Sequence, residues 1–340
     1  MNHDVEVFRN KKILITGGAG SIGSEIAEHL LEYEPAVIRI LDNNEYALHK
    51  LKQKISGSNL RFFLGDIRDK ERIERAMEGI DIVFHAAALK HVNFCEENPF
   101  EAIKTNVHGT QNVIEAALKQ NAEKFITIST DKAANPVSVM GATKLLAEKL
   151  TVSANYYKGA RRTALSCVRF GNVMESTGSV MPLFRQQIRK GGPITMTNPE
   201  MTRFMMSTSQ AVDLILSAAS RSVGREIFIL KMNSVKIGDL AEAMIEEIAP
   251  ICGYKPEEIK TEVIGTRPGE KMHEDLMTRH EAANAIETED MFIIYPKPGD
   301  NAGCTNSRGL VSNDMELLTK DQIKSIIHNV SRRLDDKNSR

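Results

Sequence analysis

A glycine pattern that follows a buried strand most constrains the fold of this chain. The almost wholly apolar run KKILIT (11–16) leads directly into TGGAGSIGSE (16–25), where Gly17, Gly20 and Gly23 recur every three residues. Apolar residues at helical spacing come next. In this context one glycine makes the tight turn, one lets the backbone approach a pyrophosphate, and one allows the helix to pack closely. Because a helix N-terminus favours an anion, we expect a dinucleotide-binding unit.

Further apolar runs repeat the strand signal, with helical stretches between them. They are AVIRILD (36–42), LRFFLGD (60–66), DIVFHAA (81–87), KFITIS (124–129), LSCVRF (165–170) and REIFIL (225–230). Helical patterns cover about 46–55, 140–156 and 208–220. Strands that alternate with helices in this way indicate βαβ units with right-handed crossovers. The expected fold class is α/β, a doubly wound parallel sheet of the Rossmann type, with a smaller mixed α/β substrate domain toward the C-terminus.

The alternation breaks up after Gly171, which sets the expected domain boundaries. GNVMESTGSVMP and GGPITMTNPEMTRF are rich in Gly, Pro, Ser and Thr, and this composition predicts ordered loops around a pocket. We assign 1–172 and 207–236 to the dinucleotide-binding domain, and 173–206 and 237–340 to an interleaved substrate domain. The polar tail RRLDDKNSR is expected to be frayed.

The overall charge and the cysteines argue against several other classes of protein. Lys plus Arg number 44 and Asp plus Glu 45, so neither nucleic acid nor an anionic membrane is expected as the main partner. No metal-ligand spacing occurs, and the cysteines fit reduced thiols, so no metal is expected. They are Cys95, Cys167, Cys252 and Cys304. No apolar run approaches the roughly 20 residues of a membrane span, and the start MNHDVEVFRNKK lacks the apolar core of a signal peptide, which predicts a cytoplasmic protein.

An acidic residue at the end of the second strand predicts which dinucleotide binds. Asp42 lies 19 residues beyond Gly23, close to the spacing of the carboxylate that binds a ribose 2′-hydroxyl. It would repel a 2′-phosphate, and the two asparagines that follow offer no cation, so NAD is favoured over NADP unless Arg39 reaches this loop. Asp66, at the end of the third strand, is expected either to reach the adenine or to serve as a helix N-terminal acid.

Five further motifs follow one another along the chain. They are HAAALKHV (85–92), STDKAANP (129–136), MGATK (140–144), RFGNV (169–173) and RPGEK (267–271). With the glycine pattern they resemble the extended short-chain dehydrogenases that act on nucleotide sugars. Within that group, residues 10–295 most resemble the soluble UDP-N-acetylglucosamine 4,6-dehydratases of the polysaccharide-biosynthesis type. STDK followed by Met-x-x-x-Lys is quite specific to these enzymes.

The resemblance implies a reaction and a cofactor, NAD. A 4,6-dehydratase passes the C4 hydride of the sugar to NAD, loses water across C5 and C6, and returns the hydride to C6. Such a site needs an acid for the 6-hydroxyl, a base at C5 and a route for the C4 proton. Asp131 is expected to be the acid and Lys132 the base. Burial should therefore raise the pKa of Asp131 above about 4, and burial with nearby positive charge should lower the pKa of Lys132 from about 10.4.

Met140 replaces the tyrosine that stands four residues before the lysine in most short-chain dehydrogenases. A thioether carries no proton, so the C4 proton must pass to Thr130, to a water relayed to Asp131, or to Lys132. Met140 and Lys144 share one helix face, and Lys144 is expected to bind the nicotinamide ribose. The resemblance implies that members with this methionine retain the configuration at C5.

The same resemblance assigns the remaining site residues. Cofactor contacts are expected from Gly17, Gly20, Ser21, Ile22, Gly23, Asp42, Asp66, Ile67, Ala86, Ala87, Lys90, Asn106, Ser129 and Lys144. Contacts to the UDP-sugar substrate, with arginine forks on the diphosphate, are expected from Lys90, His91, Asn172, Arg203, Arg267 and Glu270. His85 is expected to be structural, and helices at about 100–119 and 140–156 are expected to form a homodimer or a higher oligomer.

Other interpretations stay open on the sequence alone. A nucleotide-sugar C4 epimerase shares the fold, although an epimerase would normally need the tyrosine that Met140 replaces. A non-catalytic NAD-sensing scaffold would keep the glycine loop, but would have no reason to keep Asp131, Lys132 and Lys144 together. Without catalysis, Asp131 and Lys132 would form a surface salt bridge, and Met140 would be a core methionine.

Overall fold

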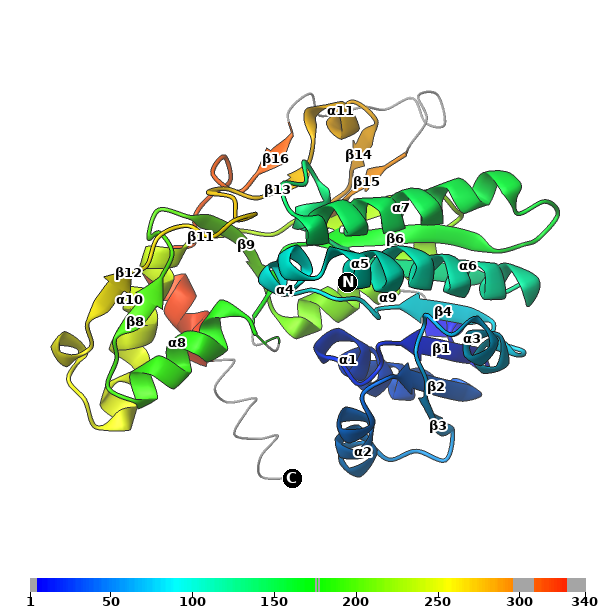
Figure 1. Cartoon of the computed structure of the whole chain (residues 1–340), viewed down its shortest axis with the longest axis horizontal. Coiled ribbons are helices and arrows are strands. Elements are labelled where there is room, and N and C mark those ends of the chain that lie inside the picture. Colours follow the sequence, from blue (N-terminus) through cyan, green and yellow to red (C-terminus); the bar gives the residue numbers. More distant parts are fainter. Residues whose placement is uncertain (1–4, 175, 177, 296–308, 329–340) are drawn as a thin grey trace.

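The computed structural model describes residues 5–174, 176, 178–295 and 309–328, and its dominant element is a nine-stranded sheet (Figure 1). The order is β3-β2-β1-β4-β5-β6-β10-β15-β14. The strands are β1 (Lys12–Thr16), β2 (Val37–Asp42), β3 (Leu60–Leu64), β4 (Ile82–His85), β5 (Lys124–Thr130), β6 (Ala164–Phe170), β10 (Ile227–Leu230), β14 (Ala285–Glu287) and β15 (Met291–Ile294). In this order, the seven strands from β3 to β10 pair in parallel with their neighbours. Strand β15 is antiparallel to both of its neighbours, β10 and β14. The predicted α/β fold class is confirmed.

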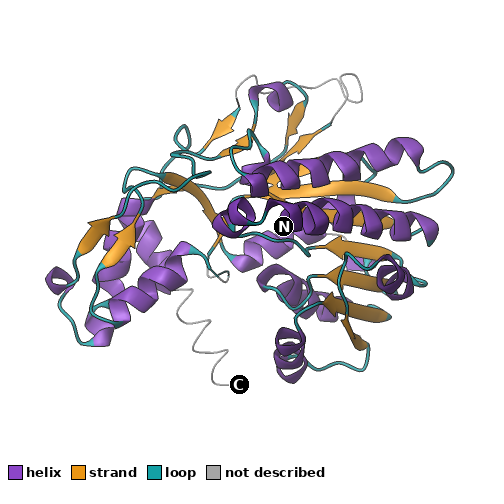
Figure 2. Ribbon diagram, viewed as in Figure 1, coloured by secondary structure: helices purple, strands orange, loops and turns teal. Residues whose placement is uncertain are grey.

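Helices cover both faces of this sheet (Figure 2). One face carries α1 and α9, and the other carries α3, α6 and α7. Their bounds are α1 (Ser21–Leu30), α3 (Lys70–Met77), α6 (Thr110–Lys119), α7 (Val139–Tyr157) and α9 (Thr208–Arg221). The strand order reverses between β1 and β4, so the crevice in which ligands bind in open α/β sheets lies at the carboxyl ends of these two strands.

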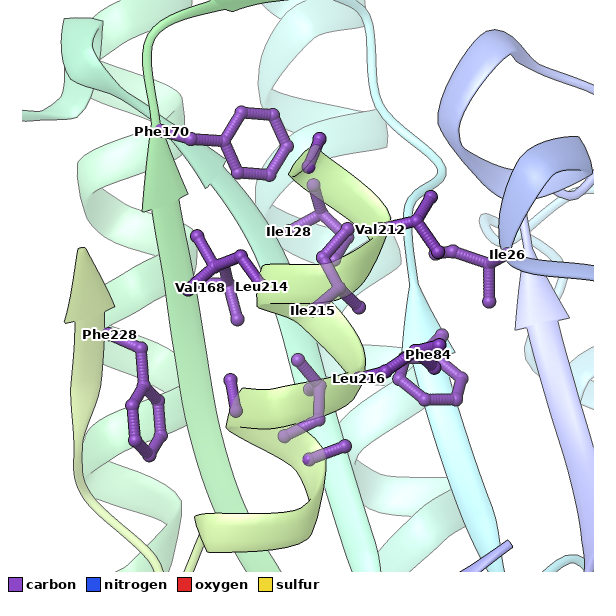
Figure 3. Close-up of a cluster of buried hydrophobic side chains, with 14 of the residues drawn as sticks. Ile26, Phe84, Ile128, Val168, Phe170, Val212, Leu214, Ile215, Leu216 and Phe228 are labelled. Atoms are coloured by element: carbon purple, nitrogen blue, oxygen red, sulfur yellow. The ribbon is translucent and has the colours of Figure 1, made fainter. Parts of the chain in front are cut away.

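Helix α9 shows how the core fixes one of these layers (Figure 3). Its side chains Val212 and Ile215 are fully buried in the same apolar cluster as Val168 of β6. Each buried side chain of this size contributes about 1.5–3 kcal/mol. The helix begins with a capping box, because Ser207 Oγ accepts from Gln210 N (3.2 Å) and Gln210 Oε1 accepts from Ser207 N (2.8 Å). The predicted helix over 208–220 is therefore confirmed.

A second group of elements lies beside the carboxyl edge of the main sheet (Figure 1). Part of it has its own apolar cluster, to which α8, α10 and β8 contribute. Its elements β13, α11 and β16 instead bury Leu276, Met277, Ala282 and Leu310 in the main core. Its elements are β7 (Asn172–Val173), α8 (Val180–Arg189), β8 (Ile194–Met196), β9 (Thr202–Met206), β11 (Ser234–Lys236), α10 (Ile237–Ile248), β12 (Thr261–Val263), β13 (Asp275–Met277), α11 (Arg279–Ala282) and β16 (Leu310–Val311). They form the small sheets β11-β9-β7, β12-β8 and β13-β16.

Two expectations for this region need correction. The stretch after Gly171 is not made of loops alone, since α8 buries Met181, Phe184 and Ile188 at helical spacing. Pro182 in its first turn and the flanking glycines hide that period in the sequence. The predicted domain boundary also fails at 285–294, because β15 pairs with β10 and extends the main sheet.

Several short helices connect these elements. They are α2 (Glu45–Lys54), α4 (Val92–Glu97), α5 (Pro99–Ile103), a π-helical segment (Lys104–Gly109), and the 3-10 helices Val5–Val7, Leu31–Tyr33, Asp131–Ala133, Pro250–Cys252 and Pro256–Glu258. Cys95, Cys167 and Cys252 are free thiols, whereas Cys304 and the polar tail lie outside the described residues. Within the described ranges, no helix combines the length and the apolar character that crossing a bilayer requires.

A buried ion cluster ties α7 and β6 to the segment after β13. Arg169 is fully buried and meets Glu148 through Nε and Nη2 (3.0 and 2.6 Å). It also meets Glu281 through Nη1 and Nη2 (3.0 and 2.9 Å). Burial lowers the pKa of Arg169, but the two carboxylates outweigh burial and raise it. The guanidinium therefore stays charged and compensates two carboxylates.

The substitution Arg169→Ala tests this cluster. Because it leaves carboxylates buried without a counter-charge, the free energy of unfolding should fall by about 3–5 kcal/mol. Arg221→Ala is the matched control, since it removes a partly exposed pair with Asp290 (3.2 Å) that should be worth about 1 kcal/mol or less. Denaturant unfolding of both variants measures the difference, and equal losses would contradict the role given to the cluster.

Candidate active site

The turn after β1 forms a cradle for an anion at the start of α1. Gly17 has φ +66° and its missing Cβ would lie 2.6 Å from the backbone of Ala87. The N-cap residue Gly20 places no side chain over the helix N-terminus, which begins at Ser21. A Cβ on Gly23 would collide with the Gly17 carbonyl, so this glycine packs the helix against the turn rather than against the sheet. Gly17 therefore allows the turn to lie against the loop after β4, whereas the absence of a side chain at Gly20 leaves the N-terminus of α1 accessible to an anion.

Two predicted cofactor acids lie at the ends of β2 and β3. Asp42 accepts from Ala19 N and Asn44 N (3.0 Å each), which orients its carboxylate at the mouth of the glycine loop. Asp66 accepts from Arg68 Nη2 (2.6 Å). Burial opposes ionisation of Asp66, but the hydrogen bonds and charge of Arg68 outweigh it and lower the pKa of Asp66. Asp69, not Asp66, caps α3.

The loop after β4 is clamped by a side chain that was expected to touch the cofactor. Asn106, in the π-helical segment, is buried and accepts from Leu89 N (2.8 Å). Its Nδ2 donates to Leu89 O and to Thr143 Oγ1 (3.0 Å each). The loop and α7 are therefore fixed to one another next to Lys144. In this arrangement Asn106 positions the loop instead of facing a ligand.

Neighbouring side chains of the same loop have depressed basicity. Burial lowers the pKa of Lys90, and burial together with the charge of Lys90 lowers the pKa of His91. His85 is enclosed, with its ring nitrogens 2.8 Å from Thr16 Oγ1 and 2.9 Å from Thr110 Oγ1. Burial and the charge of Lys144 lower the pKa of His85 to about 3, so it is a neutral structural histidine. Ile67 is also buried and packs beside Gly109, and Ile22 borders the main core.

The carboxyl end of β5 carries the most concentrated group of polar side chains in the site. Asp131 is fully buried (0% exposed), and its Oδ1 accepts from Thr130 Oγ1 (2.7 Å) and Lys132 Nζ (2.9 Å). Lys132 Nζ also lies 3.2 Å from Glu274 Oε1. Asp131 Oδ2 and Glu274 Oε2 are buried and find no hydrogen-bond partner in the part of the chain that the structure describes. The pair predicted from the sequence therefore faces a second carboxylate, from the segment before β13.

Glu274 was missed by the sequence interpretation. It follows the RPGEK motif, and several acids occur close together there with no periodic pattern to single it out. Its burial (2% exposed) and its contact with Lys132 become visible once β13 lies beside the loop after β5.

The charge state expected for Lys132 is wrong for this arrangement. Burial lowers the pKa of Lys132, but Asp131 and Glu274 outweigh burial and raise it. The nearby Arg203 opposes them with a smaller effect. Two carboxylates therefore hold Lys132 as an ammonium ion, whereas burial and nearby positive charge had been expected to keep it neutral.

Met140 and Lys144 lie on α7 but have different surroundings. Met140 is buried in a small apolar cluster with Cys95 and Ala102. Lys144 Nζ donates to the Ile128 carbonyl at the end of β5 (2.5 Å). Burial lowers the pKa of Lys144 to about 8. Met140 thus contributes only packing. Lys144 contributes a hydrogen-bond donor whose ammonium group loses its proton more easily than that of an ordinary lysine.

Other predicted ligand residues offer polar atoms that the protein leaves without a partner. Ser129 Oγ and Asn172 Oδ1 are buried with no hydrogen-bond partner among the described residues. Ser129 lies near the carboxyl end of β5, and Asn172 follows the carboxyl end of β6, so both are near the crevice. Such atoms fit a cofactor or sugar that would complete their hydrogen bonds, because buried polar groups are normally satisfied.

The predicted diphosphate arginines have different surroundings. Arg203 is buried, and it donates to the carbonyls of Thr202 (2.8 Å) and Lys271 (2.9 Å) and lies 3.5 Å from Glu270. It therefore fixes the RPGEK loop and has few donors left for a phosphate. Arg267 is exposed, and its backbone N donates to Glu270 Oε2 (3.2 Å).

Lys271 was not predicted, yet it joins this loop to the candidate catalytic segment. Its Nζ donates to the Ala134 carbonyl (2.9 Å) and to Asp275 Oδ2 (2.8 Å). The contact brings the RPGEK loop against the residues that follow Lys132.

Comparison with known families now places the chain. A family described as polysaccharide biosynthesis protein matches residues 13–296. The chain belongs to this family. The match agrees with the stretch, 10–295, over which the sequence resembles polysaccharide-biosynthesis dehydratases.

Relatives within and near this polysaccharide biosynthesis family carry several names. An uncharacterized membrane protein of Methanocaldococcus jannaschii is 57% identical over 95% of this chain and 97% of its own length. A UDP-N-acetylglucosamine 4,6-dehydratase (inverting) of Campylobacter jejuni is 43% identical over 85% and 84%. A UDP-glucose 4-epimerase of Rickettsia prowazekii is 38% identical over 96% and 93%.

Solved structures agree with the fold. Pen from Bacillus thuringiensis superposes with a TM-score of 0.89 at 44% identity, covering 95% of this chain and 98% of that chain. A dTDP-glucose 4,6-dehydratase from Streptomyces venezuelae with NAD bound gives a TM-score of 0.68 at 22% identity, covering 77% and 86%. At that identity the second likeness shows the shared fold alone.

The substitution Asn106→Ala tests the clamp on the loop after β4. It would leave Leu89 N–H and C=O without side-chain partners, at about 1–3 kcal/mol for each buried unsatisfied group. We expect a lower free energy of unfolding and faster amide exchange at Leu89. Asn98→Ala is the control, since Asn98 is exposed, its side chain donates to Phe94 O (3.0 Å), and its loss should change stability by about 0.5 kcal/mol or less. Unchanged exchange at Leu89 in the Asn106 variant would refute the clamp.

Proposed function

We propose that this protein is an NAD-dependent UDP-N-acetylglucosamine 4,6-dehydratase that forms UDP-2-acetamido-2,6-dideoxy-4-keto-hexose with retention at C5. One observation carries the proposal: a fully buried acid and an amine, Asp131 and Lys132, lie 2.9 Å apart at the carboxyl end of β5. Elimination of water from a sugar needs an acid and a base at this distance from one another and from the substrate. The family and the dehydratase relative support the same substrate class.

The residues of the crevice fit NAD. The cradle at Gly17 and the open N-terminus of α1 would take the pyrophosphate, and Asp42 would take the adenosine ribose hydroxyls. Lys144, beside the end of β5, would bind the nicotinamide ribose, and Ser129 Oγ lacks a partner that the bound cofactor would supply. When bound, NAD takes the hydride of C4 and gives it back at C6.

Thr130, Asp131 and Lys132 would divide the proton transfers. Thr130 Oγ1 donates to Asp131 Oδ1 (2.7 Å), so it can take the proton of the C4 hydroxyl while passing its own to the carboxylate. Asp131 then holds the proton with which the 6-hydroxyl leaves as water. Lys132, in its neutral form, removes the C5 proton and returns it to the same face after the hydride reaches C6. Retention follows because Met140 offers no proton on another face.

The second apolar cluster is proposed to form the base of the substrate part. Asn172, with its unpartnered Oδ1 at the end of β6, faces the crevice from this side and is assigned to the sugar or its β-phosphate. Arg267 and Glu270 of the RPGEK loop are assigned to the diphosphate and ribose, while Arg203 holds that loop in place. The exposed Phe100 (77%) lies within the helices that we propose pair two subunits.

The assay is incubation with UDP-N-acetylglucosamine, with the product analysed by mass spectrometry and NMR. A dehydratase gives a product lighter by one water with a new C6 methyl group. Unchanged mass with an inverted C4 hydroxyl would instead support the epimerase, the activity named for the Rickettsia relative. No turnover would overturn both enzymatic assignments for this substrate.

Single substitutions test the two roles at β5. Asp131→Asn cannot protonate the leaving group and Lys132→Ala cannot remove the C5 proton, so each should lower kcat by about 10²-fold or more. Lys70→Ala, which removes an exposed pair with Glu115 (2.6 Å), is the control and should keep wild-type turnover. Near-normal kcat in either site variant would remove its assigned role.

A further inference from the structure

The proposed dehydration requires an acceptor for one further proton, the one that Lys132 carries as an ammonium ion. The C4 hydroxyl and C5 each release a proton before C5 is reprotonated, while C4 stays a ketone. In the resting site Asp131 is the acceptor within the ion pair, and Lys132, held as an ammonium ion, already carries its full set of protons. When Asp131 has taken the proton of the C4 hydroxyl, Lys132 must lose a proton before it can act on C5. The site therefore requires a further acceptor within reach of Lys132 Nζ.

Glu274 meets this requirement by geometry. Its Oε1 lies 3.2 Å from Lys132 Nζ, on a side chain that is almost fully buried (2% exposed). Its Oε2 is buried and has no hydrogen-bond partner among the described residues. Because buried polar atoms are normally hydrogen-bonded, this oxygen has room for one more hydrogen-bond partner.

The backbone around Glu274 keeps the carboxylate in this position. Glu274 N donates to Ser312 Oγ (2.9 Å), and Ser312 N donates to Glu274 O (2.8 Å). Ser312 Oγ is 2.6 Å from Thr202 Oγ1, which also meets His273 Nδ1 (2.8 Å). The segments of Ser312 and Thr202 thus fix the main chain around Glu274, and its side chain meets Lys132 of the loop after β5 and Arg203 of β9.

We propose that Glu274 accepts a proton from Lys132 once the sugar is oxidised at C4 and returns it when the cycle ends. This inference rests on the proposed dehydration and gives Glu274 a role that acts through Lys132, without contact to the sugar.

The proton transfers then balance. The C4 hydroxyl proton passes through Thr130 to Asp131, and the proton of Lys132 Nζ passes to Glu274. Neutral Lys132 takes the C5 proton while Asp131 gives its proton to the departing 6-hydroxyl, which leaves as water. Lys132 next returns a proton to C5, and Glu274 hands its proton back to Lys132. The starting charges of all three groups are restored, with no outside acid or base.

The charged groups that face this pair come from several elements. Asp131 and Glu274 face Lys132 and raise its pKa, and Arg203, whose Nε lies 3.8 Å from Glu274 Oε1, opposes them. Glu270 lies on the far side of Arg203 (3.5 Å). Removing the Glu274 charge should therefore let Lys132 lose its proton at lower pH.

The variant Glu274→Gln keeps the shape and cannot take the proton. After rapid mixing with UDP-N-acetylglucosamine, a borodeuteride quench labels ketones, and mass spectrometry separates the undehydrated 4-keto sugar from the dehydrated product. At neutral pH we expect the undehydrated 4-keto sugar to accumulate and the dehydration rate to fall by about 10²-fold. The loss should shrink as pH rises, because solvent then takes the proton of Lys132. A merely structural role would slow both steps together, without recovery at high pH.

Asp275→Asn is the matched control. It removes the neighbouring carboxylate, whose partner is Lys271 rather than Lys132, and it should not make the undehydrated ketone accumulate. A Glu274→Gln variant that dehydrates at the wild-type rate, or whose loss is the same at every pH, would overturn the inference. Wild-type protein that forms neither the undehydrated 4-keto sugar nor the dehydrated 4-keto product would instead overturn the proposed function.

A second measurement needs no turnover. The rate at which acetic anhydride acetylates Lys132, followed by peptide mass spectrometry across a pH series, reports its neutral fraction. In Glu274→Gln the midpoint should move to lower pH, while in Asp275→Asn it should stay near the wild-type value. An unmoved midpoint in Glu274→Gln would show that the two groups are not coupled, whatever substrate the protein uses.

Discussion

The contact of Lys132 with two buried carboxylates is the interaction on which the rest of this site depends. Asp131 approaches at the end of β5 and Glu274 approaches from the segment before β13, which lies far along the chain from Lys132. An ammonium ion between them compensates charges that would otherwise be costly to bury. The same contact holds the segment before β13 against the loop after β5. The contacts of Lys132 with Asp131 and Glu274 therefore stabilise this part of the fold and also take part in the proposed chemistry.

The fold places this contact where a reaction can occur. Parallel strands end together at the crevice beside the switch point between β1 and β4, so the glycine turn, the loop after β4 and the end of β5 share one edge. Buried connections keep that edge rigid: Asn106 fixes the loop after β4 to α7, Arg169 fixes α7 and β6 to the region of α11, and Lys271 fixes the RPGEK loop to Ala134. Catalytic groups are effective when their neighbours hold them in this way.

Sequence patterns predict what is local and miss what depends on distant contacts. The strand ahead of Gly17 and the helix after Ser207 have clear periods and caps, and they were predicted nearly to the residue. Helix α8 was missed because Pro182 and glycines mask its period, and β15 because a short apolar run does not reveal its partner strand. Asp131 and Lys132 were found because they are adjacent in a recognisable motif. The charge of Lys132 was predicted wrongly because it is set by Glu274, which no spacing in the sequence links to it.

The central claim is that the amine of Lys132 acts on C5 of a UDP-sugar within this buried group. The position of that carbon in a crystal structure of the protein with NAD and UDP-N-acetylglucosamine tests it most directly. The account predicts C5 at about 3–3.5 Å from Lys132 Nζ, with the 6-hydroxyl toward Asp131 and with Glu274 still in contact with Lys132. A sugar bound with C5 remote from Lys132, or with the amine turned away from both carboxylates, would contradict it.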